Sequence, residues 1–385
     1  MHRNPFEYGR ELGPAELVDR ADELASVAQT IERRGKLFLI GPRRYGKTSI
    51  LRAATALAEE AGTCVLRYDA QAFPTIGDLA ERLAADTVRR LTGTVARAGK
   101  AVTEFFGAVR PAASFDPADG SWTLSLAGAP NRVTGAPLLA DVLDGVDKAA
   151  AKSRRRVAVI IDEFQEVVEH GGPAAEEQLR AAIQQHRHVA YVFAGSKTRL
   201  LADMVSDASR PFYRLGDVRF LGPVPRGDFI RFLSAAFQTT GIRATADAVV
   251  AILEHADDVP YNVQALASAC WDRAHASNDS IAIDAAFVAN VQAAEARRLD
   301  PLYTQLWGAL TAPQRQALLA VIRQRGSGLL ASASARRYKL SVATMQSALD
   351  ALEKKLIIRS DSAGGSPTFR MEDPLFRAWV ELAIN

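Results

Sequence analysis

The octapeptide at residues 41–48, Gly-Pro-Arg-Arg-Tyr-Gly-Lys-Thr, has the spacing of a phosphate-binding loop. An apolar run at 37–40 precedes it and helical periodicity follows it at 49–61, so the motif lies between a buried strand and a helix, as it must. Glycines at both ends let the backbone wrap around a pyrophosphate without a Cβ in the way. The N–H groups of the loop and of the helix N-terminus then face the anion. We therefore predict a nucleotide site here.

Two side chains of this loop carry its chemistry. Lys47 would reach the β- and γ-phosphates, and the Thr48 hydroxyl would bind Mg²⁺. The predicted cofactors are therefore ATP and Mg²⁺. The positions expected to contact the nucleotide are Gly41, Pro42, Arg43, Arg44, Tyr45, Gly46, Lys47, Thr48 and Ser49.

A second apolar run ends in an acidic pair. Residues 156–161 are typical of a parallel strand buried on both faces, and Asp162 and Glu163 follow them. Asp162 at the strand end would hold the shell of the metal ion. Glu163, on the other side of the backbone, could act as a general base that polarises the attacking water. The alternative is a solvated strand end, which an Asp-Glu dipeptide alone does not exclude.

A third predicted strand, at 188–194, ends in Gly195 and Ser196. Ligands of a doubly wound sheet gather at the carboxyl ends of its strands, so Ser196 is expected in the same crevice. Its hydroxyl could bind the γ-phosphate or the attacking water. It could instead cap the helix that follows, and one residue could do both.

The composition indicates a globular chain of several domains. With 385 residues it is too long for one ordinary core and suits two or three. No run of about 18 apolar residues predicts a membrane span, and the first residues lack the apolar core of a secretory signal. Cys64 and Cys270 lie far apart in apolar stretches, which favours buried free thiols. We expect a cytoplasmic protein with no membrane partner.

Alternating strand and helix patterns predict an α/β core with a parallel sheet. The predicted strands are 37–40, 63–69, 156–161, 188–194 and 218–221, and the predicted helices are 21–34, 49–61, 76–93, 136–152, 173–186 and 198–207. Residues 96–135 are rich in Gly, Pro and Ser, and we interpret them as an outward-facing insertion with a hairpin.

Beyond residue 225 the strand signals disappear. Helices are predicted at 226–239, 245–254, 261–276 and 283–298, and then at 311–325, 329–338 and 341–355 before two strands joined by a Gly-rich turn within 356–371. The first group is interpreted as a helical lid and the second as a winged helix-turn-helix. We therefore predict three domains: an ATPase core at 1–225, a lid at 226–300 and a winged helix at 301–385.

Positive charge is concentrated in the last of these domains. Residues 301–385 hold 11 Lys+Arg and 6 Asp+Glu, a net charge of +5 against +3 for the whole chain. If the third helix enters a major groove, the candidate DNA contacts are Arg336, Arg337, Lys339, Gln346 and Arg370. The exposed face of that helix is not strongly basic, so contact with a partner protein or closure over the ATPase is the alternative.

Taken together, these features resemble the archaeal-type ATPases of the STAND class (signal-transduction ATPases with numerous domains), a branch of the AAA+-related P-loop proteins. The resemblance runs nearly from end to end, and the phosphate-binding loop and the closing motif are its most specific parts. The matching segments are 4–9, 18–24, 41–49, 161–165, 193–196, 260–261 and the closing Asp-Pro-Leu-Phe-Arg-Ala-Trp at 373–379.

The resemblance implies further site residues. In this class a Gly-x-Pro signature in the lid contacts the nucleotide; here Asp258 stands at the glycine position, so Pro260 is the expected contact and the tight glycine turn is in doubt. AAA+-type proteins often place a charge-stabilising arginine ahead of the last strand, where this chain has Arg210 and Arg214. Each could act on its own site or on a neighbour's. Each could instead serve only the surface or the packing of its loop.

Three functions are compatible with these residues. The first is a slow, Mg²⁺-dependent ATPase that acts as a switch and couples its nucleotide state, through the winged helix, to duplex DNA or to a partner protein or effector in trans. The second is an oligomeric DNA-loading or initiator ATPase, similar to origin-recognition proteins. The third is a winged-helix scaffold that binds ATP and hydrolyses little of it. The sequence leaves the oligomeric state open.

Overall fold

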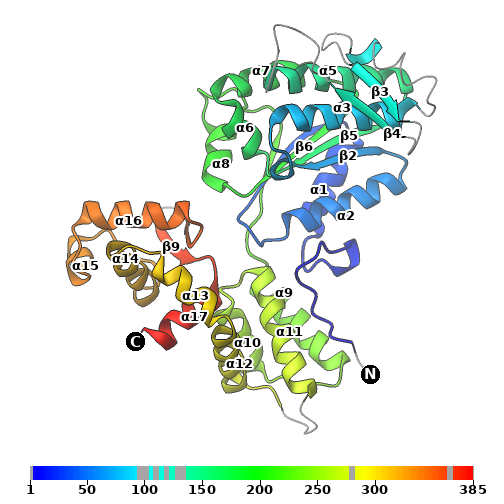
Figure 1. Ribbon diagram of the computed structural model, residues 1–385. Coiled ribbons are helices and arrows are strands. Elements are labelled where there is room, and N and C mark those ends of the chain that lie inside the picture. Colours follow the sequence, from blue (N-terminus) through cyan, green and yellow to red (C-terminus); the bar gives the residue numbers. More distant parts are fainter. Residues whose placement is uncertain are drawn as a thin grey trace. The chain divides into compact units, whose positions relative to one another are not determined.

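The structure is a computed structural model that describes residues 3–92, 104–106, 112–116, 121–125, 136–276, 282–361 and 367–384. The chain divides into two compact units, Gly9–Pro225 and a second that joins Met1–Tyr8 to Arg226–Asn385 (Figure 1). Within the described ranges, no helix combines the length and the apolar character needed to cross a bilayer.

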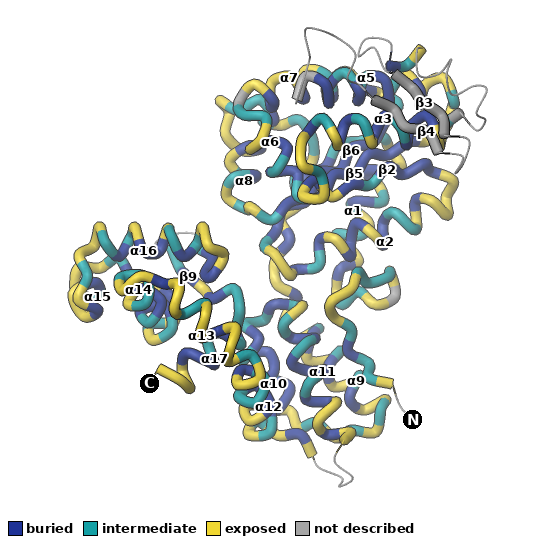
Figure 2. Tube along the Cα trace, viewed as in Figure 1, coloured by how far each residue is buried: buried dark blue, intermediate teal, exposed yellow. Residues whose placement is uncertain are grey.

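The first unit is built on a five-stranded sheet in the order β2-β5-β6-β1-β7, and every pair of neighbours is parallel. Its strands are β1 (Lys36–Ile40), β2 (Cys64–Asp69), β5 (Val157–Asp162), β6 (Val189–Gly195) and β7 (Asp217–Phe220). Each lies within one residue of its predicted bounds. β5 and β6 are buried at every position (Figure 2), because helices cover both faces of the sheet.

Helices α3, α5 and α7 cover one face of this sheet, and α1 and α2 cover the other (Figure 1). The helices of the unit are α1 (Ala21–Glu32), α2 (Lys47–Glu60), α3 (Ile76–Thr92), α5 (Ala136–Ser153), α6 (Gln165–Gly171), α7 (Pro173–Gln185) and α8 (Thr198–Ser206), with 3-10 turns at Pro14–Glu16 and Ala70–Ala72. The short helix α6 was not predicted, since seven residues are too few for a clear helical period.

The predicted insertion contains an antiparallel pair, β3 (Ala112–Asp116) with β4 (Ser121–Ser125). This pairing confirms the predicted hairpin strands. The rest of the 96–135 segment, apart from residues 104–106, lies outside the described residues.

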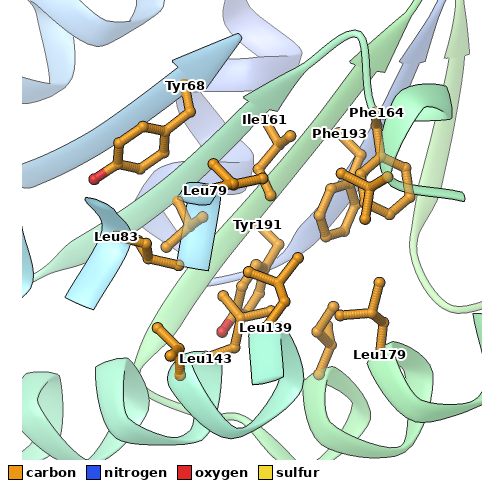
Figure 3. Packing of buried hydrophobic residues seen from close by; sticks show 14 of the residues in the cluster. Tyr68, Leu79, Leu83, Leu139, Leu143, Ile161, Phe164, Leu179, Tyr191 and Phe193 are labelled. Atoms are coloured by element: carbon orange, nitrogen blue, oxygen red, sulfur yellow. The ribbon is translucent and has the colours of Figure 1, made fainter. Parts of the chain in front are cut away.

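The core of the first unit lies between the sheet and the helices α3, α5 and α7 (Figure 3). Phe193 of β6 packs against Phe164, with ring centroids 4.4 Å apart, and against Phe38 of β1 at 5.2 Å. Leu139 of α5 lies beside Tyr191 of β6, and Leu179 of α7 faces the rings of Phe193 and Phe164 (Figure 3). Because Phe164 follows the acidic pair directly, its burial anchors the end of β5 against the core.

The second unit contains helices and one small hairpin. Its elements are α9 (Arg226–Thr239), α10 (Ala246–His255), α11 (Pro260–Ala276), α12 (Ala285–Arg298), α13 (Asp300–Gly308), α14 (Ala312–Arg323), α15 (Ser332–Arg337), α16 (Val342–Lys354), β8 (Ile358–Asp361), β9 (Thr368–Met371) and α17 (Pro374–Ala383). The N-terminal segment belongs here because Phe6 is buried against Phe237 of α9, with centroids 4.7 Å apart, and the Asn4 amide donates to Ser268 Oγ of α11 at 2.8 Å.

The predicted helices and the predicted hairpin of the winged helix are confirmed as α14 to α16, β8 and β9. Helices α13 and α17 flank them and were not predicted. For α17 the signal was present in the closing motif. The side chain of Asp373 accepts a hydrogen bond from the backbone N–H of Leu375, and Pro374 occupies the first turn, which together make a helix start.

Candidate functional site

The loop between β1 and α2 turns at two glycines for different reasons. A Cβ on Gly41 would lie 2.7 Å from Leu221 Cβ and 3.0 Å from the Leu221 carbonyl oxygen. Leu221, which follows β7, therefore leaves no space for a side chain at position 41, and only glycine fits there. Gly46 has φ of 90°, the left-handed region that glycine adopts without strain. It turns the backbone so that α2 begins at Lys47, with its N-terminus at the loop.

Lys47 lies inside this loop. Its residue is 5% exposed, and Nζ donates to the carbonyl oxygens of Gly41 at 2.8 Å and of Pro42 at 2.9 Å. The side chain thus crosses the turn and brings its positive charge beside the N-terminal end of α2, where the helix dipole also favours anions. The loop holds a cation and backbone donors together, which is the arrangement a phosphate needs.

The two predicted metal ligands meet. Thr48 Oγ1 donates to Asp162 Oδ2 at 2.8 Å, although the residues come from α2 and from the end of β5. Burial raises the pKa of Asp162 above its ordinary value of 3.8. The hydrogen bond from Thr48 opposes this shift, and the charge of Glu163 adds to it. Asp162 is therefore a buried carboxylate with a hydroxyl partner and a nearby lysine.

Glu163 and Ser196 also meet. Glu163 has φ of 50°, which is uncommon for a residue with a Cβ, and Ser196 Oγ donates to its Oε2 at 2.7 Å. The backbone N–H of Phe164 donates to the Ala194 carbonyl oxygen at 2.8 Å and ties the ends of β5 and β6 together. β6 pairs in parallel with both β5 and β1, so Glu163 and Ser196 lie at the same carboxyl edge of the sheet as the phosphate-binding loop.

The oxygen atoms of Thr48 and Asp162 suit Mg²⁺ as ligands. The hydroxyl of Thr48 and the carboxylate of Asp162 supply oxygen, which Mg²⁺ prefers, and Mg²⁺ commonly binds one or two carboxylates and the phosphates of its substrate. Across the described part of the chain, no group of three or more His, Cys, Asp and Glu side chains could hold a metal. The residues therefore fit a magnesium ion that arrives with a nucleotide.

The remaining loop positions differ in exposure. Arg43 and Arg44 are exposed, and Tyr45 is buried. The sequence did not predict that Arg20 contacts this loop. Buried Arg20 donates from Nη2 to the Gly222 carbonyl oxygen at 2.7 Å and to that of Tyr45 at 3.5 Å. Its only sequence signal was the 18–24 segment of the family resemblance.

Ser49 connects the loop helix to the N-terminal part of the unit. Its Oγ accepts a hydrogen bond from the backbone N–H of Leu12 at 3.1 Å, and the residue is buried. The carboxylate of Glu11 accepts a hydrogen bond from Arg67 at 2.9 Å, so this segment is also fastened to β2. Neither contact has a signature in the local sequence.

The two candidate arginines have different surroundings. Arg210 forms an ion pair with Glu176 of α7, whose side chain is 4% exposed, and two of its guanidinium nitrogens donate to that carboxylate. Arg214 is exposed, and its guanidinium lies 5.1 Å from the ring centre of Tyr213. Arg210 therefore neutralises a buried carboxylate of its own unit, whereas Arg214 faces solvent.

The other predicted residues belong to the second unit. Pro260 begins α11, and the Asp258 before it has φ of 56°, so the left-handed turn in question is formed with aspartate in place of glycine. Arg226 Nε donates to Asp258 Oδ1 at 2.8 Å. Short polar side chains tolerate this conformation better than most.

The candidate DNA contacts differ in their surroundings. The basic ones are exposed: Arg336, Arg337, Lys339 and Arg370. Gln346, on α16, instead donates its amide to Asp350 Oδ1 at 2.7 Å. Arg336 and Arg337 lie on α15, ahead of the third helix of the winged helix.

Two parts of the chain match known families. Residues 30–202 match the family described as an AAA domain, and residues 301–382 match the one described as a probable winged helix domain. No curated protein matches the sequence.

Solved structures are similar to this chain over nearly its whole length. The chain is similar to the Walker-type ATPase of Pyrococcus abyssi, with 16% identity and a TM-score of 0.63 over 98% of this chain and 99% of that one. It is also similar to the Aeropyrum pernix ORC2 protein in its ADPNP–ADP complexes, with 14% identity and a TM-score of 0.56 over 99% and 97%. The predicted fold class is confirmed: an AAA-type P-loop NTPase fold with a parallel five-stranded sheet, followed by a winged helix.

Proposed function

We propose that this chain is a slow, Mg²⁺-dependent ATPase that works as a switch of the STAND type, with a core at 1–225, a lid at 226–300 and a winged helix at 301–385. Residues 3–8 of the core segment pack on the lid helices α9 and α11. The observation that carries the proposal is the 2.8 Å contact between Thr48 and Asp162, beside Lys47 and Glu163. The AAA domain match over residues 30–202 supports the ATPase assignment.

In this proposal the loop binds the triphosphate. Phosphate oxygens replace the Gly41 and Pro42 carbonyls as acceptors for Lys47, and the backbone N–H groups of the loop bind the same anion. Thr48 and Asp162 would hold Mg²⁺, which neutralises charge on the phosphates when it is bound. The ORC2 structure described with ADPNP and ADP supports nucleotide as the ligand of this fold.

Hydrolysis falls to the residues at the ends of β5 and β6. Glu163 accepts the proton of the attacking water as a general base, and Ser196, hydrogen-bonded to it at 2.7 Å, orients it or binds the γ-phosphate. The ion pair of Arg210 with Glu176 favours a structural role for that arginine. Exposed Arg214 is the better candidate for charge stabilisation, in its own site or in a neighbour's.

The switch itself involves the second unit. Pro260 at the start of α11 is the proposed lid contact with the nucleotide. The winged helix carries the output, and the exposed Arg336, Arg337, Lys339 and Arg370 favour duplex DNA as its partner. A protein effector in trans is the alternative partner. An oligomeric initiator-type ATPase remains the second candidate function, because Arg214 is exposed and could act on a neighbouring copy.

Two variants test the ATPase proposal. Lys47→Ala removes a charge-assisted contact of about 1.5–3 kcal/mol, so calorimetry should show Mg·ATP affinity lower by roughly tenfold to a hundredfold. Glu163→Gln should keep that affinity and lower kcat by about 10²–10⁴. Lys152→Ala, an exposed lysine paired with Glu104, is the matched control and should change neither. Unchanged turnover in Glu163→Gln would remove Glu163 from its role, and the absence of any heat with Mg·ATP in the unmodified protein would end the proposal.

A further inference from the structure

Gln165, two residues after the proposed general base, is a fully buried polar side chain. The residue is 0% exposed and begins α6. Its Nε2 donates to Glu163 Oε2, the same oxygen that accepts the hydrogen bond from Ser196 at 2.7 Å. Glu163 is therefore held by two donors, one from its own loop and one from the end of β6.

The chemistry of the groups decides how the amide is turned. An ionised carboxylate only accepts hydrogen bonds, so the nitrogen of Gln165 must face Glu163 and the oxygen must face away. Among the described residues, that buried Oε1 has no hydrogen-bond partner. A buried acceptor without a partner is unfavourable, so the amide is held in this orientation at a cost to the fold.

The end of β6 leaves room for this amide only because residue 195 is glycine. A Cβ on Gly195 would lie 2.2 Å from Gln165 Oε1 and 2.4 Å from Leu201 Cδ1. Both are the far ends of flexible side chains, so an added methyl group would push them aside and leave the strand in place. Gly195 therefore leaves the space that the Gln165 amide occupies while its nitrogen donates to the carboxylate of Glu163.

We propose that Gln165 is a positioning residue for ATP hydrolysis, an inference that rests on the proposed function. Its amide and the Ser196 hydroxyl both occupy Oε2 of Glu163, which fixes the side chain and leaves Oε1 of Glu163 to accept the proton of the water. The backbone at Glu163, at φ of 50°, is held out of the common regions at the same point. In this proposal Gln165 acts through Glu163, the group to which its amide donates.

The first test is Gln165→Met, which keeps the length of the side chain and removes the donor. We expect kcat for ATP to fall by about tenfold to a hundredfold, within the contribution of a positioned base, while KM and the calorimetric affinity for Mg·ATP stay unchanged. In a Glu163→Gln background the same substitution should lower kcat no further, because its target is already gone. An equal fall in kcat in both backgrounds would overturn the proposal.

A second variant protects the test against misfolding. Gly195→Ala leaves Gln165 and Glu163 unchanged in sequence and displaces the amide sterically, so it should reproduce the kcat defect, again only when Glu163 is present. Gln292→Met is the matched control, since Gln292 is also buried and also donates from Nε2, to the His255 carbonyl oxygen at 3.2 Å. It should lower the melting temperature and leave kcat unchanged.

The ATPase activity and the positioning role of Gln165 can be tested separately. If Glu163→Gln leaves turnover intact, the ATPase proposal fails, and the role of Gln165 fails with it. If Glu163→Gln abolishes turnover while both Gln165→Met and Gly195→Ala retain full kcat, only the positioning role is wrong.

Discussion

At the scale of single residues, the acidic pair after β5 shows how burial and function oppose each other. Asp162 is 5% exposed, and burial raises its pKa because a desolvated carboxylate favours its neutral form. The hydrogen bond from Thr48 and the charge of Lys47 offset this effect of burial only in part. A bound cation would remove that disadvantage, so stability and ligand binding are linked through one side chain.

This linkage predicts the effect of Asp162→Asn. A raised pKa in the folded state means that the folded protein binds the proton more tightly, so stability falls as pH rises from 3.8 through the folded pKa. Above that window the neutral asparagine should be more stable than aspartate, with a rise in Tm of roughly 2–4 °C for each kcal/mol relieved. Below it the two proteins should converge.

Thermal melts from about pH 4 to about pH 7, with and without Mg·ATP, check this prediction. The variant should gain less from Mg·ATP than the unmodified protein does. Asp203→Asn, at an exposed position of α8, controls for the loss of a surface charge. A variant that is less stable than the parent at neutral pH without nucleotide would contradict the argument from burial.

At the scale of elements, strand order explains why residues far apart in the sequence meet. β6 lies between β5 and β1 and pairs with both in parallel, so the carboxyl ends of all three lie at one edge of the sheet and bring Ser196, Glu163 and the loop together. Two short helices also carry residues of interest: α6 carries Gln165 of the first unit, and α17 carries Arg377 of the second. Neither helix was predicted, although each bears a residue of the family resemblance.

Arg377 joins α17 to the turn between α10 and α11. Its Nη1 donates to Asp257 Oδ1 at 2.6 Å and its Nη2 to the His255 carbonyl oxygen at 3.1 Å. Asp257 has φ of 54° and directly precedes Asp258, so the arginine fastens the winged helix to the turn that leads to Pro260. Burial and the charge of Arg377 also lower the pKa of His255.

Removal of this arginine should destabilise the second unit. The side chains of Arg377 and Asp257 are 22% and 14% exposed, and a hydrogen bond to a charged group contributes about 1.5–3 kcal/mol, so Arg377→Ala should lower the free energy of unfolding by roughly that amount. Urea titration measures it. Arg297→Ala, at an exposed position of α12, should cost less than about 0.5 kcal/mol. Equal effects of the two variants would show that the contact stabilises little.

At the scale of the whole molecule, charge is divided unevenly along the chain. The net charge is +3 overall and +5 over residues 301–385, so residues 1–300 carry 3 − 5 = −2. An association with DNA that involved the whole chain equally would work against the charge of its larger part. We therefore expect duplex binding, where it occurs, to depend on the winged helix.

This expectation can be measured as a salt dependence. Each arginine that no longer neutralises a phosphate should reduce the slope of log affinity against log salt by about 0.9, so Arg336→Ala with Arg337→Ala should lower it by roughly 2. Arg297→Ala with Arg298→Ala, an adjacent pair on α12, is the matched control. Affinity and solution mass should be compared with ADP, with a non-hydrolysable ATP analogue and without nucleotide. A slope near zero would exclude DNA, and a nucleotide-dependent rise in mass would favour the initiator-type alternative.

Local patterns in the sequence were enough to predict the five strands, most helices, the phosphate-binding loop and the acidic pair. The reason is that a buried parallel strand needs a continuous apolar run and an anion-binding turn needs glycines at set intervals, and both requirements act within a few residues. The roles proposed for those residues remain predictions to be tested.

What only the tertiary structure decided is which of these residues meet. Arg210 meets Glu176 and Arg377 meets Asp257 through the packing of distant segments, and no local period in the sequence records such contacts. The hydrogen bond from Gln165 to Glu163 was also decided by the tertiary structure, although the two residues are close in sequence. It depends on the space that Gly195 of another strand leaves for a buried amide.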